Sequence, residues 1–301
     1  MNAPRSQRVM VDGWIVLDKP TEMTSTFAVA RLKRLYNAKK AGHAGTLDPL
    51  ATGILPIAFG EATKTVPYVQ DGEKAYRFTV QWGEETETDD KEGAITATSA
   101  ERPTLAAIER ELPAFIGQVM QVPPAYSAIK INGERAYDLA RDGQIVQIAE
   151  RQVDIHALRL VSAERDFAVL EAECGKGTYV RAIARDLGRV LGCHGHVAAL
   201  RRTRVGPFFE ADAWSLAQLE AQDFAPLSAM RPIEAGLTEN QCIVVDRDGA
   251  ARLRNGQSLL LRGRDAPFEG TAYAACGGTV IAVGHIEHGE LHPARVFNTP
   301  Y

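Results

Sequence analysis

The sequence predicts an α+β fold, with a mixed, largely antiparallel central sheet flanked by helices and a small β domain at the C-terminal end. Strand-like and helix-like segments come in mixed order up to about residue 240, and several strand-like segments are adjacent. This order favours α+β over a doubly wound parallel sheet, in which strands and helices alternate. Beyond that point, short apolar runs are separated by glycines, as in small barrels and sandwiches. We therefore expect two domains, residues 1–240 and 241–301.

The first part of the larger domain is predicted to contain two strands and one helix. Residues 14–17 are apolar and the run ends before Pro20, which predicts a short strand. A threonine or serine at 24–26 then caps a helix whose apolar residues recur at helical spacing. Residues 76–82 alternate between apolar and polar side chains, so we expect a strand with one buried face.

The remaining elements follow from similar patterns. Residues 104–112 have a helical pattern that ends at Pro113, and two strand-like runs lie farther along the chain, at 152–161 and 166–174. An apolar stripe at 180–191 predicts a helix, and the glycine-containing turn before it lacks the spacing of a nucleotide-binding loop. The strands expected in the C-terminal domain are 242–245, 258–261, 271–276 and 279–283.

Composition indicates a globular protein without a membrane span or a metal centre. The chain has 301 residues, 45% of them hydrophobic, and no apolar run approaches the roughly 20 residues that a membrane-spanning helix needs. The N-terminus lacks the basic and then apolar layout of a secretion signal, so we expect the protein in the cytoplasm. The four cysteines are far apart, and His194 and His196 have no further ligands at a metal-binding spacing. We expect neither a disulfide framework nor a bound metal.

Charge is distributed unevenly, although the formal net charge is only −4. Residues 31–40 contain five basic residues and no acid, and residues 176–204 contain seven basic residues and one acid. Residues 209–246 are acidic by contrast, and we expect them on a face turned away from nucleic acid. Such clusters are often only solvated faces, so charge alone leaves RNA binding and a solvated surface equally open.

Asp48 is a carboxylate among apolar neighbours. Pro49 disfavours the α conformation at Asp48, and four nearby side chains would exclude water from it: Leu47, Leu50, Ile54 and Leu55. Asp followed by Pro is also a common pair at the start of a helix. These two residues alone therefore favour a helix cap over a functional carboxylate.

The wider segment favours the functional interpretation, because residues 42–64 resemble the GH-GTLDP-A-G-L…G-ATK signature of the TruB family of tRNA pseudouridine synthases. Further motifs follow in the order of that family. The matches are Lys74-Ala75-Tyr76 to a K-Y strand, residues 83–93 to a G--T-T-D--G loop, 123–130 to PPAYSA-K, 177–188 to GTY-R…DLG, and 200–208 to LRRT--G-F. From about residue 241 the resemblance is less distinctive.

The resemblance implies an isomerase that converts a uridine in the T-loop of tRNA, at position 55, to pseudouridine. The reaction breaks the bond from N1 to C1′, turns the uracil within the site and joins C5 to C1′. Because nothing is oxidised, reduced or hydrolysed, we expect no cofactor. The resemblance also implies a C-terminal PUA-type domain that contacts tRNA. We expect the T-arm of tRNA as the partner, no protein partner, and a monomer.

Asp48 matches the catalytic aspartate of the family. An isolated carboxylate in an apolar pocket tends to be neutral at pH 7, so it needs a partner cation. Arg181 matches the arginine that pairs with the aspartate, and a planar guanidinium suits this role because it stays charged. Without the resemblance, Arg181 would be a solvent-facing helix arginine like Arg185. The residues leave open whether Asp48 adds to the base or the sugar, or abstracts a sugar proton.

Four more residues match family positions that bind the substrate. Tyr76 matches the tyrosine that stacks on the target base with its hydroxyl close to the reaction, and Tyr179 and Leu200 match residues that line the uracil pocket. His43 matches the histidine that enters the T-loop when the uridine is extruded. Stacking and apolar contact stabilise a flipped base. Core packing is the alternative for the first three, and an ordinary loop histidine for the last.

Two other classes of function stay open. A non-catalytic RNA-binding or RNA-folding module would not need the charge of Asp48. A hydrolase of glycosidic bonds usually has two paired carboxylates, and Asp90 is a candidate for the second. Asp90 otherwise stands out only through the family pattern, and Lys19 and Lys64 either contact phosphate or hold the loop.

Overall fold

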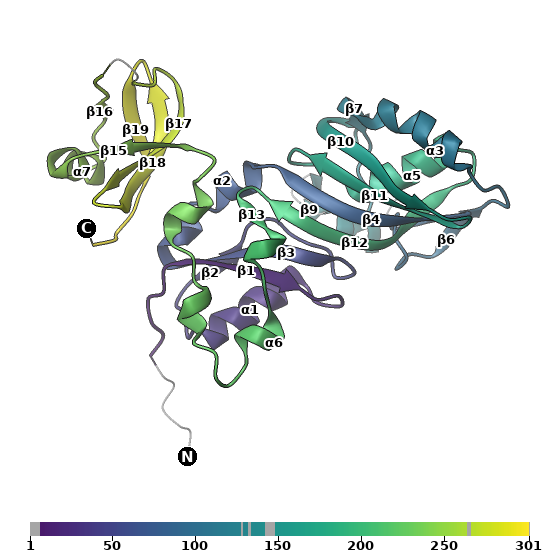
Figure 1. The fold of residues 1–301 in the computed structure, drawn as a ribbon, viewed down its shortest axis with the longest axis horizontal. Helices are drawn as coiled ribbons and strands as arrows, with labels where there is room; N and C mark the ends of the chain where they lie inside the picture. Colours follow the sequence, from purple (N-terminus) through teal and green to yellow (C-terminus); the bar gives the residue numbers. More distant parts are fainter. Residues whose placement is uncertain (1–6, 128, 132–133, 142–147, 264–265, 301) are drawn as a thin grey trace.

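The structure is a computed structural model that describes residues 7–127, 129–131, 134–141, 148–263 and 266–300. Its larger part contains a ten-stranded mixed sheet with the strand order β14-β1-β3-β12-β4-β11-β10-β7, to which β2 and β13 attach. A separate five-stranded sheet forms the C-terminal part (Figure 1). The predicted α+β fold, with a small β domain at the C-terminal end, is confirmed.

Most neighbours in the large sheet are antiparallel, as predicted. The antiparallel series consists of β12 (Gly195–Val205), β4 (Lys74–Trp82), β11 (Phe167–Cys174), β10 (Arg151–Ala163) and β7 (Gly117–Gln121). Strand β3 (Thr52–Phe59) is antiparallel to β1 (Gly13–Lys19) and β2 (Ala41–His43) but parallel to β12. At the ends, β14 (Trp214–Ser215) is parallel to β1 and β13 (Phe208–Phe209) is antiparallel to β12. The mixed centre brings the β2–β3 loop beside β12.

Side-chain alternation explains which face of the sheet is buried. In β4, Phe78, Val80 and Trp82 are buried, while Tyr76 is only partly buried at the entry end of the row. Helix α5 (Val180–Val190) packs on β12 and β4. The other helices are α1 (Ser25–Leu35), α2 (Val66–Asp71), α3 (Leu105–Glu111), α4 (Ala136–Arg141), α6 (Leu216–Leu219) and α7 (Arg247–Arg254).

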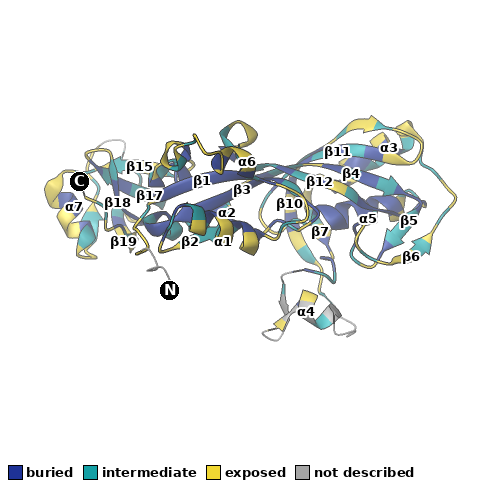
Figure 2. Ribbon diagram, turned by 90° about the horizontal axis from the view of Figure 1, so that it is seen from below, coloured by how far each residue is buried: buried dark blue, intermediate teal, exposed yellow. Residues whose placement is uncertain are grey.

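The start of α1 follows the predicted capping chemistry, and α3 begins in the same way. The hydroxyl of Thr24 accepts a hydrogen bond from the Phe27 amide at 3.1 Å, and Thr104 caps α3 in the same way. Figure 2 shows the buried strands at the centre of the molecule and α4 projecting away from the sheet. Strands β8 (Lys130–Ile131) and β9 (Glu134–Arg135), which precede α4 in the chain, pair with each other. A further small sheet pairs β5 (Glu84–Thr86) with β6 (Ile95–Thr98).

The C-terminal sheet has one strand and one helix that the sequence did not predict. Its order is β15 (Gln241–Val244), β17 (Gly270–Cys276), β18 (Thr279–Glu287), β19 (Glu290–Val296) and β16 (Leu259–Leu260). Strand β19 contains Pro293 and has a register shift against β18, so it lacks an uninterrupted apolar pattern. Helix α7 is highly polar and is capped by Asp246, whose carboxylate accepts a hydrogen bond from the Gly249 amide at 2.8 Å.

The two parts of the chain share a hydrophobic core. Val283 and Phe297 of the C-terminal part belong to the same buried cluster as Trp14 and Phe208 of the larger part. The ammonium of Lys64 donates to the Val296 carbonyl at 2.7 Å. Deleting residues 241–301 would therefore expose core side chains. A change of RNA binding in such a truncated protein would not distinguish a lost RNA contact from lost stability.

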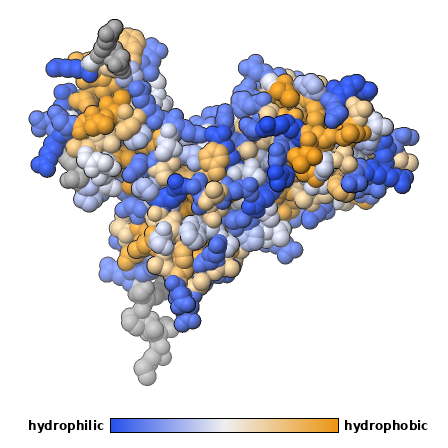
Figure 3. Space-filling view, viewed as in Figure 1, coloured by the Kyte–Doolittle hydropathy of each residue, from blue (hydrophilic) through white to orange (hydrophobic). Residues whose placement is uncertain are grey.

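The outer surface is mostly hydrophilic on the face drawn in Figure 3. Apolar side chains gather there over the C-terminal sheet and over the end of the large sheet beside α3, among other places. Exposed large hydrophobic residues include Leu105, Met120, Val161 and Phe268. Among the residues that the structure describes, no helix has the length and apolar character to cross a membrane.

Candidate active site

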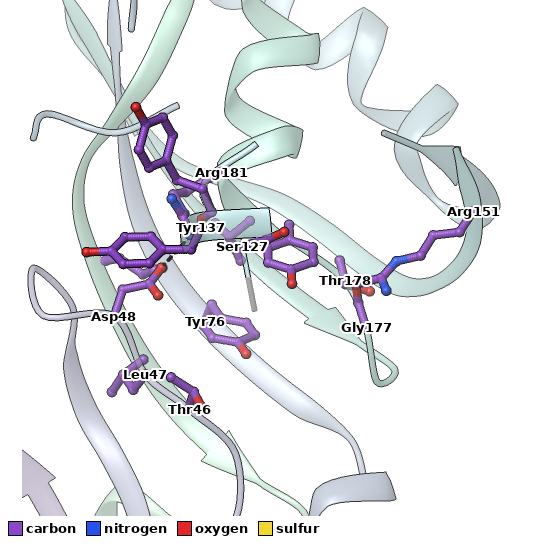
Figure 4. Close-up of a pocket in the computed structure, with 14 residues that line it drawn as sticks. Thr46, Leu47, Asp48, Tyr76, Ser127, Tyr137, Arg151, Gly177, Thr178 and Arg181 are labelled. Atoms are coloured by element: carbon purple, nitrogen blue, oxygen red, sulfur yellow. Dashed lines mark hydrogen bonds and ion pairs between the residues drawn. The ribbon is translucent and has the colours of Figure 1, made fainter. Parts of the chain in front are cut away.

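A cavity of about 340 Å³ lies where the β2–β3 loop, β4, β12 and the start of α5 meet. Five of the predicted site residues line it: Asp48, Tyr76, Tyr179, Arg181 and Leu200. Asp48 and Tyr76 lie close together at one end of the cavity, and Arg151, Gly177 and Thr178 at the other (Figure 4). Its volume falls in the range of about 300 to 1,000 Å³ that is common for small-molecule sites.

Asp48 and Arg181 are in contact across this cavity. The distance from Arg181 Nη2 to Asp48 Oδ2 is 3.0 Å. The side chain of Arg181 is only 7% exposed, whereas that of Asp48 is 36% exposed. The buried guanidinium therefore balances the charge of the Asp48 carboxylate, while part of the carboxylate stays accessible.

Asp90 is the second carboxylate on the same guanidinium. Its Oδ2 lies 3.1 Å from Arg181 Nη1, and its side chain is 3% exposed. Its Oδ1 accepts hydrogen bonds from the Thr88 hydroxyl at 2.6 Å and the Glu92 amide at 3.0 Å. Asp90 does not line the cavity. The arginine thus joins one exposed and one buried carboxylate, and it does not bind Asp48 with both nitrogens.

Arg181 also bonds to the main chain. Its Nη1 donates to the Thr88 carbonyl at 2.9 Å and its Nη2 to the Tyr126 carbonyl at 3.0 Å. The alternative of a solvent-facing helix arginine is wrong for both Arg181 and Arg185. Arg185 is also buried, with its Nη1 2.9 Å from Asp89 Oδ2.

The basic residues of the segment 176–204 do not form an open cationic surface. Arg201 donates to both carboxylate oxygens of Asp18, at 2.9 and 3.0 Å, and Arg204 forms ion pairs with Glu73 and Glu239. Arg202 is buried. In the basic segment 31–40, by contrast, Lys39 and Lys40 are exposed just before β2.

The loop that carries Asp48 is not a helix start, so the helix-cap alternative is wrong. A turn follows Asp48, in which the Ala51 amide donates to the Asp48 carbonyl at 3.1 Å, and then β3 begins. Ser25 holds the preceding residue, because its hydroxyl exchanges hydrogen bonds with the amide and carbonyl of Leu47, each at 2.9 Å. The side chain of Asp48 therefore projects from a well-anchored loop.

Lys19 contacts the backbone of this loop from the protein interior. This contact fits one of its two predicted roles, which is to hold the loop. It is fully buried, and its ammonium donates to the carbonyls of Pro20 at 2.8 Å, Met23 at 2.9 Å and Pro49 at 3.3 Å. Burial lowers the pKa of Lys19 to about 8, although the charge of Asp48 opposes the shift. Lys64, in contrast, reaches the C-terminal sheet.

The buried ammonium of Lys19 predicts a pH-dependent stability difference between the wild-type protein and Lys19→Met. The folded protein releases the proton near pH 8, whereas the unfolded chain keeps it to about 10.5. Since the unfolded state then binds more protons, the contribution of Lys19 to the free energy of unfolding rises with pH between these values. Urea unfolding at pH 7, 8 and 9 should show the wild type gaining on Lys19→Met above pH 8. A difference that stays constant, or one that Lys39→Met reproduces, would contradict this assignment.

Tyr76 presents a protonated hydroxyl to the cavity. Burial raises the pKa of Tyr76 to about 12, while the nearby Arg202 guanidinium acts in the opposite direction. At neutral pH this side chain is therefore a neutral phenol. It offers both an aromatic face and a proton donor beside Asp48.

Tyr179 and Leu200 complete the apolar walls. Gln121 fixes the main chain of Tyr179, since its side chain accepts from the Tyr179 amide at 2.8 Å and donates to the carbonyl at 3.1 Å. The Arg151 guanidinium lies 5.2 Å from the centre of the Tyr179 ring. Leu200 lies opposite Phe78 in the sheet and is 7% exposed.

His43 does not line the cavity. It lies at the end of β2, and burial together with the charge of Arg202 lowers its pKa. Within the described residues, its Nδ1 is buried and has no hydrogen-bond partner. The imidazole is therefore neutral at pH 7.

Several cavity residues were not assigned a role from the sequence. Tyr126 and Ser127 belong to the recognised PPAYSA segment, whereas Arg151 lies outside every motif and is brought to the rim by β10. Ala128 of the same segment lies outside the described residues. No group of three or more possible metal ligands occurs among the parts of the chain that the structure describes.

Known proteins are similar to this chain over nearly its whole length. The family described as TruB family pseudouridylate synthase (N terminal domain) matches residues 33–180, and the tRNA pseudouridylate synthase B C-terminal domain matches residues 181–238. A tRNA pseudouridine synthase B of Bradyrhizobium diazoefficiens is 59% identical, covering 99% of this chain and 89% of that protein. One of Rhizobium meliloti is 52% identical over 99% of this chain and all of that protein.

Solved structures with the same fold are more distant in sequence. The crystal structure of a Cbf5-Nop10-Gar1 complex aligns with a TM-score of 0.74 and 22% identity, covering 94% of this chain and 83% of that chain. An archaeal Nop10-Cbf5 complex gives 0.72 and 21%, with coverage of 98% and 88%. At this identity the likeness shows the fold alone.

Proposed function

The chain belongs to the TruB family of pseudouridylate synthases, and we propose that it converts uridine 55 in the T-loop of tRNA to pseudouridine with Asp48 as the catalytic carboxylate. The observation that carries this proposal is the 3.0 Å contact between Arg181 and Asp48 beside Tyr76 in one cavity. The chain is an isomerase, because the product has the atoms of the substrate. We expect it to act in the cytoplasm, as a monomer.

The proposed reaction needs three things from these residues. Arg181 balances the charge of Asp48 and orients its carboxylate, so that the carboxylate can add to the base or sugar or abstract a sugar proton. Tyr76 stacks on the base and donates or relays a proton while C5 loses one and N1 gains one. Tyr179 and Leu200 exclude water around the detached uracil.

The RNA must deliver an extruded uridine to this cavity. His43 lies at the end of β2, four residues before Leu47, whose backbone is held by Ser25. Its neutral ring suits insertion among stacked bases. Lys39 and Lys40, exposed immediately before β2, are placed to meet phosphates of the same RNA. We propose the T-arm as the part of tRNA that binds here.

Hydrolysis of a glycosidic bond is less well supported. A pair of catalytic carboxylates must both face the substrate. Asp90, the candidate second carboxylate, is 3% exposed and engaged by Arg181, Thr88 and Glu92. A non-catalytic RNA-binding module would not require the balanced charge of Asp48 in a cavity.

The direct test is incubation of an unmodified tRNA transcript with the purified protein, followed by site-resolved detection of pseudouridine. We expect pseudouridine at position 55 and none in a transcript with cytidine there. An isolated T-arm hairpin should also react. Free uracil would support hydrolysis, and binding without any change of the base would support the non-catalytic alternative.

Substitutions of Tyr76 separate stacking from proton transfer. Tyr76→Phe keeps the aromatic face, whereas Tyr76→Leu loses the ring and the hydroxyl. If the hydroxyl transfers a proton, both variants should lose about 10²- to 10⁴-fold in single-turnover rate, or about 3 to 5 kcal/mol. A nearly active Tyr76→Phe would restrict the role of Tyr76 to stacking. Rates are to be measured at saturating protein, so that weaker binding does not contribute.

A further inference from the structure

Arg202 is a buried cation without a carboxylate partner. It lies on β12 and is 2% exposed, and no carboxylate of the described residues forms an ion pair with it. Arg181 and Arg185, which are also buried, each contact two acidic side chains. Burial of an unpaired charge is costly, and burial accordingly lowers the pKa of Arg202. Because burial of this charge costs stability, the groups that the guanidinium binds inside the protein indicate its role.

Three hydrogen bonds from Arg202 go to main-chain carbonyls of the loop that carries Asp48 and of the strand that follows it. Its Nη2 donates to the Gly45 carbonyl and its Nη1 to the Thr46 carbonyl, both at 3.1 Å, and its Nε donates to the Ile54 carbonyl at 2.8 Å. These carbonyls lie on both sides of Asp48 in the chain. One rigid, planar guanidinium therefore closes the two ends of the loop.

The backbone at this point is built around Arg202. Gly53 pairs with Arg202 between the parallel strands β3 and β12, with a φ of +99°. A Cβ atom at Gly53 would lie 2.2 Å from the Arg202 carbonyl oxygen. The close approach of the two strands, which only glycine permits, brings the loop carbonyls within reach of the guanidinium.

Arg202 also meets Tyr76. The two residues are paired across β12 and β4, and the charge of the Arg202 guanidinium opposes the rise in the pKa of the Tyr76 phenol. Because a guanidinium has no acceptor, Arg202 cannot take a hydrogen bond from the phenol, and the phenol proton is left for a partner in the cavity. Arg202 itself does not line the cavity.

We propose that Arg202 is a positioning residue that fixes the loop of Asp48 and the phenol of Tyr76 relative to each other, so that both face the same base. The inference rests on the proposed function of Asp48 and Tyr76. It assigns to the LRRT segment a task inside the protein, not a contact with RNA.

The test compares Arg202→Lys and Arg202→Ala with the matched controls Arg204→Lys and Arg204→Ala. Arg204 lies on the same strand but pairs with Glu73 and Glu239 at the surface. We expect Arg202→Lys to lose about 100-fold in single-turnover rate, the cost of a misplacement on the order of 1 Å, with the Kd for tRNA changed by less than about twofold. In Arg202→Ala, millimolar guanidinium should restore part of the rate and ammonium should not.

Hydrogen exchange gives a readout that does not depend on activity. Amides of residues 44–55 should exchange faster in both Arg202 variants than in the wild type, and unchanged in the Arg204 variants. If the wild type makes no pseudouridine, the proposed function fails, while the exchange result still tests the hold on the loop.

Four outcomes would overturn the inference about Arg202. They are a wild-type rate in folded Arg202→Lys, a rate loss matched by an equal loss of tRNA affinity, equal losses in the Arg204 controls, and failure of both Arg202 variants to fold by circular dichroism. The last would make Arg202 a folding residue only. Restoration of the rate by guanidinium together with faster exchange of the loop would support the proposal.

Discussion

Asp48→Asn is expected to abolish turnover while the fold and most of the tRNA affinity are retained. The amide has the size of the carboxylate but lacks its charge, and Arg181 remains bonded to Asp90 and to two carbonyls. The loss in single-turnover rate should be at least the roughly 10²- to 10⁴-fold of a lost general acid or base, and larger for a nucleophile. Because Asp48 is partly exposed, the change costs little stability.

Three measurements check this result: circular dichroism for the fold, the Kd for unmodified tRNA, and pseudouridine formed at saturating protein. Asp71→Asn is a matched control, because Asp71 is an exposed carboxylate that pairs with Lys176 at the surface. Turnover close to the wild type in Asp48→Asn would remove Asp48 from the mechanism. Loss of binding in parallel with turnover would make it a binding residue.

Local patterns predicted much of the fold and of the cavity. The alternation of β4 placed Tyr76 at the end of a buried row, a capping residue located α1, and a helical pattern before Pro113 located α3. Strand β19 was missed because Pro293 and a register shift interrupt its pattern. A strand with such an interruption forms because it pairs with neighbouring strands, and sequence periodicity does not specify these neighbours.

The charged network could not be predicted from spacing. Arg181 and Arg185 look like a solvated helix face, but the loop with Asp89 and Asp90 covers them from a distant part of the chain. Arg202 is buried only because β12 lies between β3 and β4 in the sheet. These contacts join segments that are far apart in the chain. The sequence therefore indicated a cluster of basic residues but not which of them are buried.

Arg181→Lys is expected to lower the rate of reaction much more than the affinity for tRNA. The guanidinium contacts Asp48 and Asp90 with different nitrogens and also bonds to two carbonyls, on Thr88 and Tyr126. A lysine ammonium is a single point charge and cannot occupy both positions. We expect a loss of about 10²- to 10³-fold in single-turnover rate, as for removal of one preorganised donor. Arg181→Met should in addition destabilise the fold by about 3 to 5 kcal/mol, because it leaves a buried carboxylate unpaired.

Arg185→Lys is the matched control for this prediction. Arg185 lies one turn farther along α5, is equally buried, and pairs with Asp89 and Asp186, yet it does not line the cavity. Both lysine variants should lose similar stability in urea unfolding, but only Arg181→Lys should lose rate at saturating protein. Equal losses of rate would mean that α5 has shifted as a whole and that the contact with Asp48 is not the cause. A loss of affinity in proportion to the rate would instead make Arg181 a contact to RNA phosphate, and the charge of Asp48 would then need another partner.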